Sequence, residues 1–129
     1  MAVELSDSER IRLGELVTQT FDLWGIKDEL QVKLLGLPEK TKARQMTRYR
    51  HGQQPLPQEE DLLERAKHIL GIQHSLELMF PLNKSMPNFW LRNRNRSLKG
   101  IPLIIMLETG LTGMGRVWGT LDCTQNWED

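Results

Sequence analysis

The chain has 129 residues, and its 17 Lys and Arg are balanced by 17 Asp and Glu, so that the formal net charge is zero. This length fits one ordinary domain or two very small ones, and the neutral total excludes a generally basic protein that coats nucleic acid. Cys123 is the only cysteine, which excludes an intrachain disulfide and fits a reducing cytoplasm. The longest apolar run, residues 101–107, is far too short to span a membrane, so we expect a cytoplasmic protein.

Apolar residues recur at helical spacing along most of the chain, whereas the alternation typical of strands is almost absent. We therefore expect an all-α fold. The first helix should begin after Ser6, because Ser6 and Glu9 match a capping box, and it should end at Gly25. A second, short helix is expected over residues 27–35, with Gly36 after its last residue.

A third, basic helix is expected from Pro38 to about Tyr49, since proline suits the first position of a helix. Two short helices joined by a tight glycine-containing turn form a helix-turn-helix pattern, whose second helix enters the DNA major groove. Residues 34–52 carry five cations against Glu39 alone. A solvated helix surface would explain this charge, but cations that follow such a turn favour DNA contact. The candidate DNA-binding residues are Lys40, Thr41, Lys42, Arg44, Gln45, Arg48, Tyr49 and Arg50.

Helix-breaking residues at 52–57 predict a domain boundary. We expect a first domain over residues 1–54, a helix-turn-helix bundle, and a second, small helical domain over residues 55–129. A long helix should run over residues 57–80, with carboxylates in its first turn that suit the helix dipole. Gly71 inside this helix indicates a close crossing with another helix.

Three further helices are expected in the second half, over residues 86–92, 102–109 and 112–122. Trp90 should lie in the core of this half. The tail at 123–129 has no periodicity. Trp127 in this tail either folds back over the core or anchors the chain in a pocket of a partner, where tryptophan is favoured.

A second cationic stretch has no carboxylate between Lys84 and Glu108. Its cations are Arg92, Arg94, Arg96 and Lys99. One interpretation is a loop that its charge keeps soluble, and the other is a surface for an anionic partner, either protein or phosphate.

No pattern in the sequence indicates enzyme chemistry. His51, His68 and His74 lack metal-ligand spacing with carboxylates or with the cysteine, and no glycine-rich phosphate loop is present. We therefore expect no catalytic residue, no bound metal and no cofactor. The protein should act by binding other macromolecules.

Four pieces of the sequence stand in order: residues 34–38, 55–81 and 89–107, and the Trp-bearing end of the chain. Together they resemble the MbcA/ParS/Xre group of antitoxins. "LLGLP" at 34–38 is similar to the start of that family's DNA-recognition helix, and residues 55–81 are similar to its long helix. "FWLRNRNRSLKGIPLIIML" at 89–107 resembles its Trp-Leu-Arg segment, and the Trp-bearing end of the chain resembles its C-terminus. Met46 stands where the family often has tryptophan. The likeness covers roughly residues 20–129.

The resemblance implies the antitoxin of a type II toxin–antitoxin system, whose toxin has the RES fold and consumes NAD. Family members cover the toxin's active site with the C-terminal domain and repress their operon by binding operator DNA through the N-terminal domain. It also implies a homodimer within a larger toxin–antitoxin complex. The alternative is a stand-alone helix-turn-helix regulator or a partition-type DNA-binding protein. The candidate toxin-binding residues are Arg92, Arg94, Arg96, Lys99, Asn126, Trp127, Glu128 and Asp129.

Overall fold

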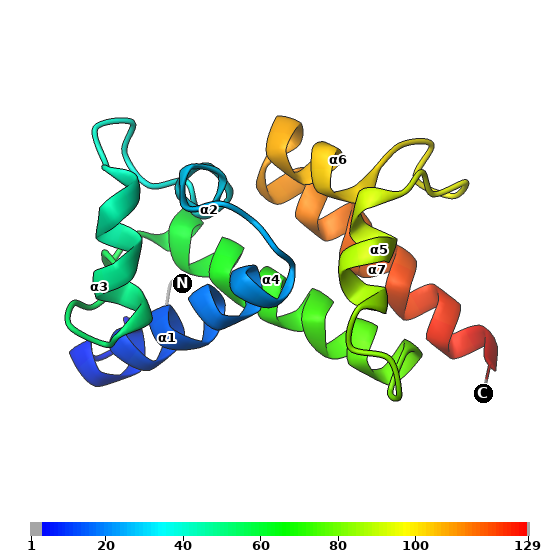
Figure 1. Cartoon of the computed structure of the whole chain (residues 1–129), viewed down its shortest axis with the longest axis horizontal. Coiled ribbons are helices and arrows are strands. Elements are labelled where there is room, and N and C mark those ends of the chain that lie inside the picture. The colour runs from blue at the N-terminus through cyan, green and yellow to red at the C-terminus, as the bar shows by residue number, and fades with distance from the viewer. Residues whose placement is uncertain (1–3, 129) are drawn as a thin grey trace. The chain divides into compact units, whose positions relative to one another are not determined.

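The structure is a computed structural model that describes residues 4–128, with side chains as far as Cys123. The described residues form α-helices and one short 3-10 helix without any strand, which confirms the expected all-α fold (Figure 1). Asn95 and Gly100 form an isolated antiparallel bridge. The chain divides into two compact units, Met1–Lys67 (unit 1) and His68–Asp129 (unit 2).

The boundary between the two units falls inside α4 (Glu60–Met79), further along the chain than the domain boundary expected between residues 54 and 55. The segment before α4 packs within unit 1. Leu56 is fully buried beside Gly14, and its carbonyl accepts a hydrogen bond from Arg10 Nη1 at 2.7 Å. The proline-rich segment at 52–57 is therefore a connection inside unit 1.

Unit 1 contains α1 (Asp7–Leu23), α2 (Asp28–Leu35), η1 (Ala43–Gln45), α3 (Met46–Arg50) and the first part of α4. The predicted capping box of α1 is confirmed, because Ser6 Oγ accepts from the Glu9 amide at 3.1 Å and the Ser6 amide donates to Glu9 Oε1 at 3.0 Å. The hydrogen bond that the Ser6 amide donates to the Glu9 carboxylate, and after it the Ser6 side chain, lower the pKa of Glu9. The predicted end of α2 is also confirmed, since Gly36 adopts the left-handed φ of 70° that glycine reaches without strain.

The basic helix begins later than the sequence predicts. The Thr41 amide donates to the Pro38 carbonyl at 2.8 Å in a turn, and Lys42 is extended with ψ 143°. Helical structure starts at Ala43 with η1 and continues as α3. The predicted helix start at Pro38 is wrong because the fixed φ of proline is compatible with a helix but does not require one, and here Pro38 is the first residue of a turn.

The predicted start of the long helix at Pro57 is wrong for the same reason. The Glu59 amide donates to the Pro57 carbonyl at 2.9 Å, which closes a tight turn. The first bond of helical type runs from the Leu63 amide to the Glu59 carbonyl at 3.0 Å, and α4 begins at Glu60.

The core of unit 1 forms where α1 packs against α3 and α2 packs against η1. Val17 and Phe21 of α1 and its C-cap residue Trp24 follow one another at helical spacing, so that all three face inward. The rings of Phe21 and Trp24 meet edge to face with their centroids 6.2 Å apart. Met46, the first residue of α3, is fully buried with them.

Unit 2 contains the rest of α4, α5 (Met86–Arg92), α6 (Pro102–Thr109) and α7 (Leu111–Glu128). The predicted bounds of α5 and α6 are confirmed. The last helix was expected to end at residue 122, but α7 continues to Glu128. The sequence after Gly119 has no glycine or proline to stop it, and the backbone hydrogen bonds of a helix do not need apolar periodicity.

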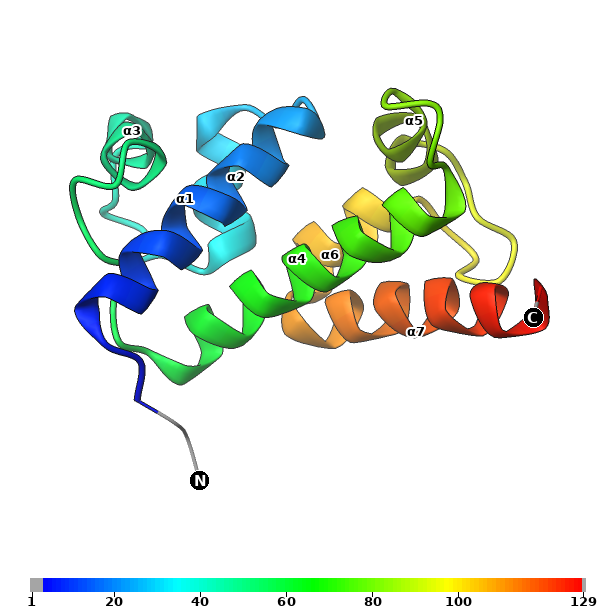
Figure 2. The same ribbon diagram turned by 90° about the horizontal axis from the view of Figure 1, so that it is seen from below.

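Gly71 allows α4 and α7 to approach closely, as the sequence predicts (Figure 2). A Cβ atom at Gly71 would lie 2.2 Å from Cζ2 of Trp118. The His68 ring packs edge to face on the same indole, with the centroids 5.1 Å apart. Trp90 is half-buried rather than a core residue, which corrects that expectation. No helix in residues 4–128 has both the length and the apolar character that a membrane crossing requires.

Candidate nucleic-acid interface

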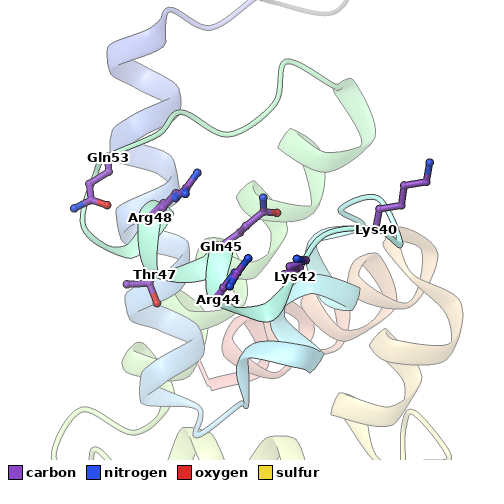
Figure 3. A pocket seen from close by; sticks show the side chains of 7 residues that line it. All are labelled: Lys40, Lys42, Arg44, Gln45, Thr47, Arg48 and Gln53. Atoms are coloured by element: carbon purple, nitrogen blue, oxygen red, sulfur yellow. The ribbon is translucent and has the colours of Figure 1, made fainter.

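A polar groove of about 410 Å³ lies on unit 1 beside η1 and α3 (Figure 3). The side chains around it come from the loop after α2, from η1 and α3, and from the turn after α3. No carboxylate lines it. We call it the cationic groove, and its lining residues are Lys40, Lys42, Arg44, Gln45, Thr47, Arg48 and Gln53.

The cations of this groove are exposed, and none of them forms an ion pair with any described residue. They are Lys40, Lys42, Arg44 and Arg48. An uncompensated group of four cations raises the local positive potential and favours anionic partners. The amides of Gln45 and Gln53 and the hydroxyl of Thr47 add hydrogen-bonding groups to the same groove.

The local fold separates this polar face from the core. Met46 and Tyr49 are three residues apart and are buried, whereas Arg44 and Arg48 are four apart and are exposed. These two spacings place the apolar pair on one face of the helical segment and the arginines on another. The segment at 43–50 is therefore amphipathic, although it is very short.

Tyr49 was expected to contact DNA, and the structure corrects this. It is only 4% exposed, and it lies against Gly14 of α1. Burial raises the pKa of its phenol. A core position explains why an aromatic side chain stands here. Tyr49 therefore packs in the core of unit 1 and does not line the groove.

Arg50 was also expected to contact DNA, but its guanidinium points to carboxylates of its own unit. Its Nε donates to Asp22 Oδ2 at 2.8 Å and its Nη2 donates to Asp28 Oδ1 at 2.9 Å. Burial disfavours the charged guanidinium, but the hydrogen bonds and charges of Asp22 and Asp28 outweigh it and raise the pKa of Arg50. Its charge is thus compensated, and Arg50 is not part of the groove.

Thr41 lines a second pocket of about 370 Å³ rather than the cationic groove. This pocket lies between α2 and η1, and its apolar residues include Val32 and Leu37. Its charged lining residues are Glu29, Glu39 and Lys33, so it has mixed charge, unlike the groove. The predicted DNA-binding set is therefore divided among the groove, this pocket, the core and the ion pairs of Arg50.

Sequence reasoning missed two groove residues, Thr47 and Gln53. Gln53 comes back to α3 through a Schellman motif, in which its amide donates to the Arg48 carbonyl at 2.8 Å and the Gly52 amide donates to the Tyr49 carbonyl at 3.2 Å. Gly52 has the positive φ of 66° that this motif uses. A glycine at the end of a predicted helix was the available signal that the next residue would turn back onto it.

The second cationic stretch forms a closed loop in unit 2. The Asn95 amide donates to the Gly100 carbonyl at 2.8 Å, and the Gly100 amide donates back at 3.3 Å. Asn95 Oδ1 accepts from the Leu98 amide at 3.0 Å, and the Leu98 side chain is buried. Arg116 Nη2 of α7 donates to the Leu98 carbonyl at 3.2 Å. These contacts hold the loop in one shape.

This loop presents Arg94, Arg96 and Lys99 to solvent. We call residues 93–100 the cationic loop. Lys99 adopts a positive φ of 58°, which is unfavourable for a residue with a Cβ atom. Arg92, at the end of α5, is exposed, and its Nε donates to Asn88 Oδ1. The structure thus brings three of the four predicted cations together on one loop.

The other predicted toxin-binding residues lie at the C-terminus. The backbone of Asn126, Trp127 and Glu128 continues α7, but their side chains and the whole of Asp129 lie outside the described residues. Cys123, just before them, is exposed and free. Within the described part of the chain, no three His, Cys, Asp or Glu side chains gather in a way that could hold a metal ion.

Neither of two comparisons with known proteins gives a relative for this site. No protein-family model matches the chain, and no curated protein matches it. The groove and the loop are interpreted below from their own charge and geometry, together with the motifs of the sequence.

Proposed function

We propose that unit 1 binds duplex DNA through the cationic groove. The observation that carries this proposal is the group of four exposed cations without carboxylate partners around a groove that also presents two glutamines. Lys and Arg bind phosphate oxygens, and Arg and Gln are the common readers of guanine and adenine edges in the major groove. The same residue types serve both purposes here.

The order α2, loop, η1 and α3 supports a helix-turn-helix unit. In such a unit the segment at 43–50 enters the major groove, with Arg44 and Arg48 directed at the DNA. Lys40 and Lys42 precede this segment in the loop, where they are placed to bind flanking phosphates. Because one short segment reaches few bases, a homodimer that reads two half-sites is the expected form.

We also propose that the whole protein is the antitoxin of a type II system with a RES-fold, NAD-consuming toxin. The support is the resemblance of residues 20–129 to the MbcA/ParS/Xre antitoxins. Unit 2 covers the toxin's active site in this proposal, and unit 1 represses the operon. A stand-alone regulator would share the groove but would have no enzyme partner.

Inhibition of a toxin requires no chemistry from unit 2, because a protein that fills the mouth of a substrate pocket excludes a dinucleotide by size. Arg94, Arg96 and Lys99 of the cationic loop would attract carboxylates on the toxin and speed the encounter. Leu82 and Phe89 are 98% and 60% exposed, and such side chains provide apolar contact area for a protein partner.

The DNA-binding proposal is tested with the DNA upstream of the gene. We expect the wild-type protein to bind this fragment, and we expect Arg44→Ala with Arg48→Ala to weaken binding by about 100-fold while the melting temperature stays the same. Arg12→Ala is the matched control, because Arg12 is an exposed arginine of α1 outside the groove. Equal loss of binding in the control would contradict the role of the groove.

The antitoxin proposal is tested with the product of the neighbouring gene. We expect that product to be lethal when expressed alone, and we expect the wild-type protein and the Arg44→Ala, Arg48→Ala variant to rescue growth equally and to co-purify with it. A harmless neighbour together with intact upstream DNA binding would favour the stand-alone regulator. Loss of rescue in the double variant would contradict the division of roles between the units.

A further inference from the structure

We infer that Arg50 is a positioning residue that fixes α3, and hence the cationic groove, without touching DNA. The inference rests on the proposed DNA binding of unit 1. In the sequence, Arg50 belongs to the same basic run as Arg44 and Arg48. In the structure it differs from them, because its side chain is only 22% exposed and is bound to two carboxylates.

The contacts of Arg50 connect three helices. From the last residue of α3, the guanidinium reaches Asp22 near the end of α1 and Asp28 at the start of α2. The contact with Asp22 uses both carboxylate oxygens, since Nη2 also donates to Oδ1 at 3.2 Å. Bidentate pairs of an arginine and a carboxylate fix the orientation of the two side chains as well as their distance, which a lysine ammonium cannot do.

A buried glutamine completes this cluster. Gln31 of α2 is fully buried, and its Nε2 donates to the Ile26 carbonyl at 2.8 Å and to Asp22 Oδ1 at 3.1 Å. Its Oε1 accepts from Arg50 Nη2 at 3.4 Å. The amide thus orients both Asp22 and Arg50, so the cluster is held from inside the unit.

We call the contacts of Arg50 with Asp22, Asp28 and Gln31 the Arg50 clamp. The shortness of α3 makes this clamp important. A helix of five residues, Met46–Arg50, has almost no stability of its own, so its position depends on tertiary contacts. Met46 and Tyr49 provide apolar contacts, and Arg50 provides the polar contacts at its C-terminal end. A shift of this end would move Arg48 and the Gln53 that is bonded to its carbonyl.

Neutralising the carboxylate partners separates positioning from direct contact, because the two roles predict opposite signs. If Arg50 bound phosphate, Asp22→Asn with Asp28→Asn would remove negative charge near DNA, free Arg50 and tighten binding. If Arg50 positions α3, the same variant weakens DNA binding by about tenfold, since the charge-assisted bonds that hold the helix are absent.

Glu29→Gln is the matched control, because Glu29 follows Asp28 on α2 and has no ion-pair partner among the described residues. This control should bind DNA as tightly as the wild type or slightly more tightly. Arg50→Lys keeps the positive charge but cannot form the bidentate pair with Asp22. We therefore expect it to weaken DNA binding as Asp22→Asn with Asp28→Asn does, while the slope of log affinity against log salt stays unchanged.

Tighter DNA binding by the Asp22→Asn, Asp28→Asn variant, or a smaller salt slope in Arg50→Ala, would overturn the inference. Hydrogen exchange gives a readout that does not depend on DNA. We expect the amides of α3 to exchange faster in the Asn variant while those in the first half of α1 stay protected. If the wild type binds no DNA, the proposed function fails, and unchanged α3 exchange would then reject the clamp separately.

Discussion

The cationic groove of unit 1 and the cationic loop of unit 2 have similar charge but different construction. In the groove, cations stand on a helical segment and its preceding loop, around a hollow that also holds glutamine and threonine side chains. In the loop, three cations stand on a turn closed by the Asn95–Gly100 pair. A hollow with amides and arginines suits base edges and phosphates, whereas a projecting loop supplies mainly charge.

Two arginines of the basic run also differ from each other. Arg48 and Arg50 are two residues apart on the same short helix, yet one is exposed without a carboxylate partner and the other is bound to Asp22 and Asp28. The number of cations in a segment therefore does not equal the number available to a ligand. Their partners in other helices decide which of them remain available.

The largest expected effect is on DNA affinity, and it distinguishes the cationic groove from the cationic loop. We expect Arg44→Ala with Arg48→Ala to weaken DNA binding by about 100-fold, because the variant lacks two arginines that bind bases or phosphates. Arg94→Ala with Arg96→Ala should change it by less than about twofold, since loop cations outside the interface act only at long range. Fluorescence anisotropy with a labelled duplex measures both. Equal losses would erase the distinction between the surfaces.

The next effect concerns stability and is confined to unit 2. Gly71→Ala should lower its free energy of unfolding by about 1–3 kcal/mol, because the new Cβ overlaps the Trp118 indole and forces repacking. Gly119→Ala is the control, since a Cβ there meets no atom within 4 Å, and it should raise stability by about 0.5–1 kcal/mol. Urea unfolding compares the two, and equal stabilities would reject the close crossing.

A smaller effect is expected on the rate of toxin binding. Replacing Arg94, Arg96 and Lys99 by alanine should slow association by about tenfold at low salt and leave dissociation nearly unchanged, because exposed charges steer the encounter. Stopped-flow mixing with the neighbouring gene product measures both rates. A change confined to dissociation would instead place these cations inside the buried contact.

The smallest effect tests the shape of the cationic loop. Lys99→Gly should raise stability by about 0.5 kcal/mol, because relief of the positive φ exceeds the extra entropy of an unfolded glycine. Arg96→Gly, at a position without positive φ, should lower it by a similar amount. Thermal melts compare the stabilities of the two variants, and a loss of stability in both would show that the backbone of Lys99 is not strained.

Local signals predicted much of the fold. Ser6 with Glu9, Gly36 and Pro102 mark helix ends through their own backbone chemistry, and each was assigned from neighbours a few residues away. Pro38 was misassigned because the fixed φ of proline is compatible with a helix start without requiring one. The continuation of α7 was missed because the residues after Asp122 have no apolar periodicity.

The candidate site was harder to predict because it depends on distant contacts. Arg44 and Arg48 were assigned from charge and spacing, and both line the groove. Arg50 has the same charge as Arg44 and Arg48, but Asp22, far away in sequence, holds it inside unit 1. No local pattern in the sequence identifies this partner. For Tyr49 a local signal existed, since it lies three residues from the apolar Met46 and both are buried.

The most direct test of the central claim is the salt dependence of duplex DNA binding by the wild-type protein and the Arg44→Ala, Arg48→Ala variant. We predict that log affinity falls linearly with log salt for the wild type, and that the variant's slope is smaller by about 0.9 for each phosphate that the two arginines neutralise. Binding that ignores salt, or two identical slopes, would contradict the claim that this groove is the DNA-binding surface.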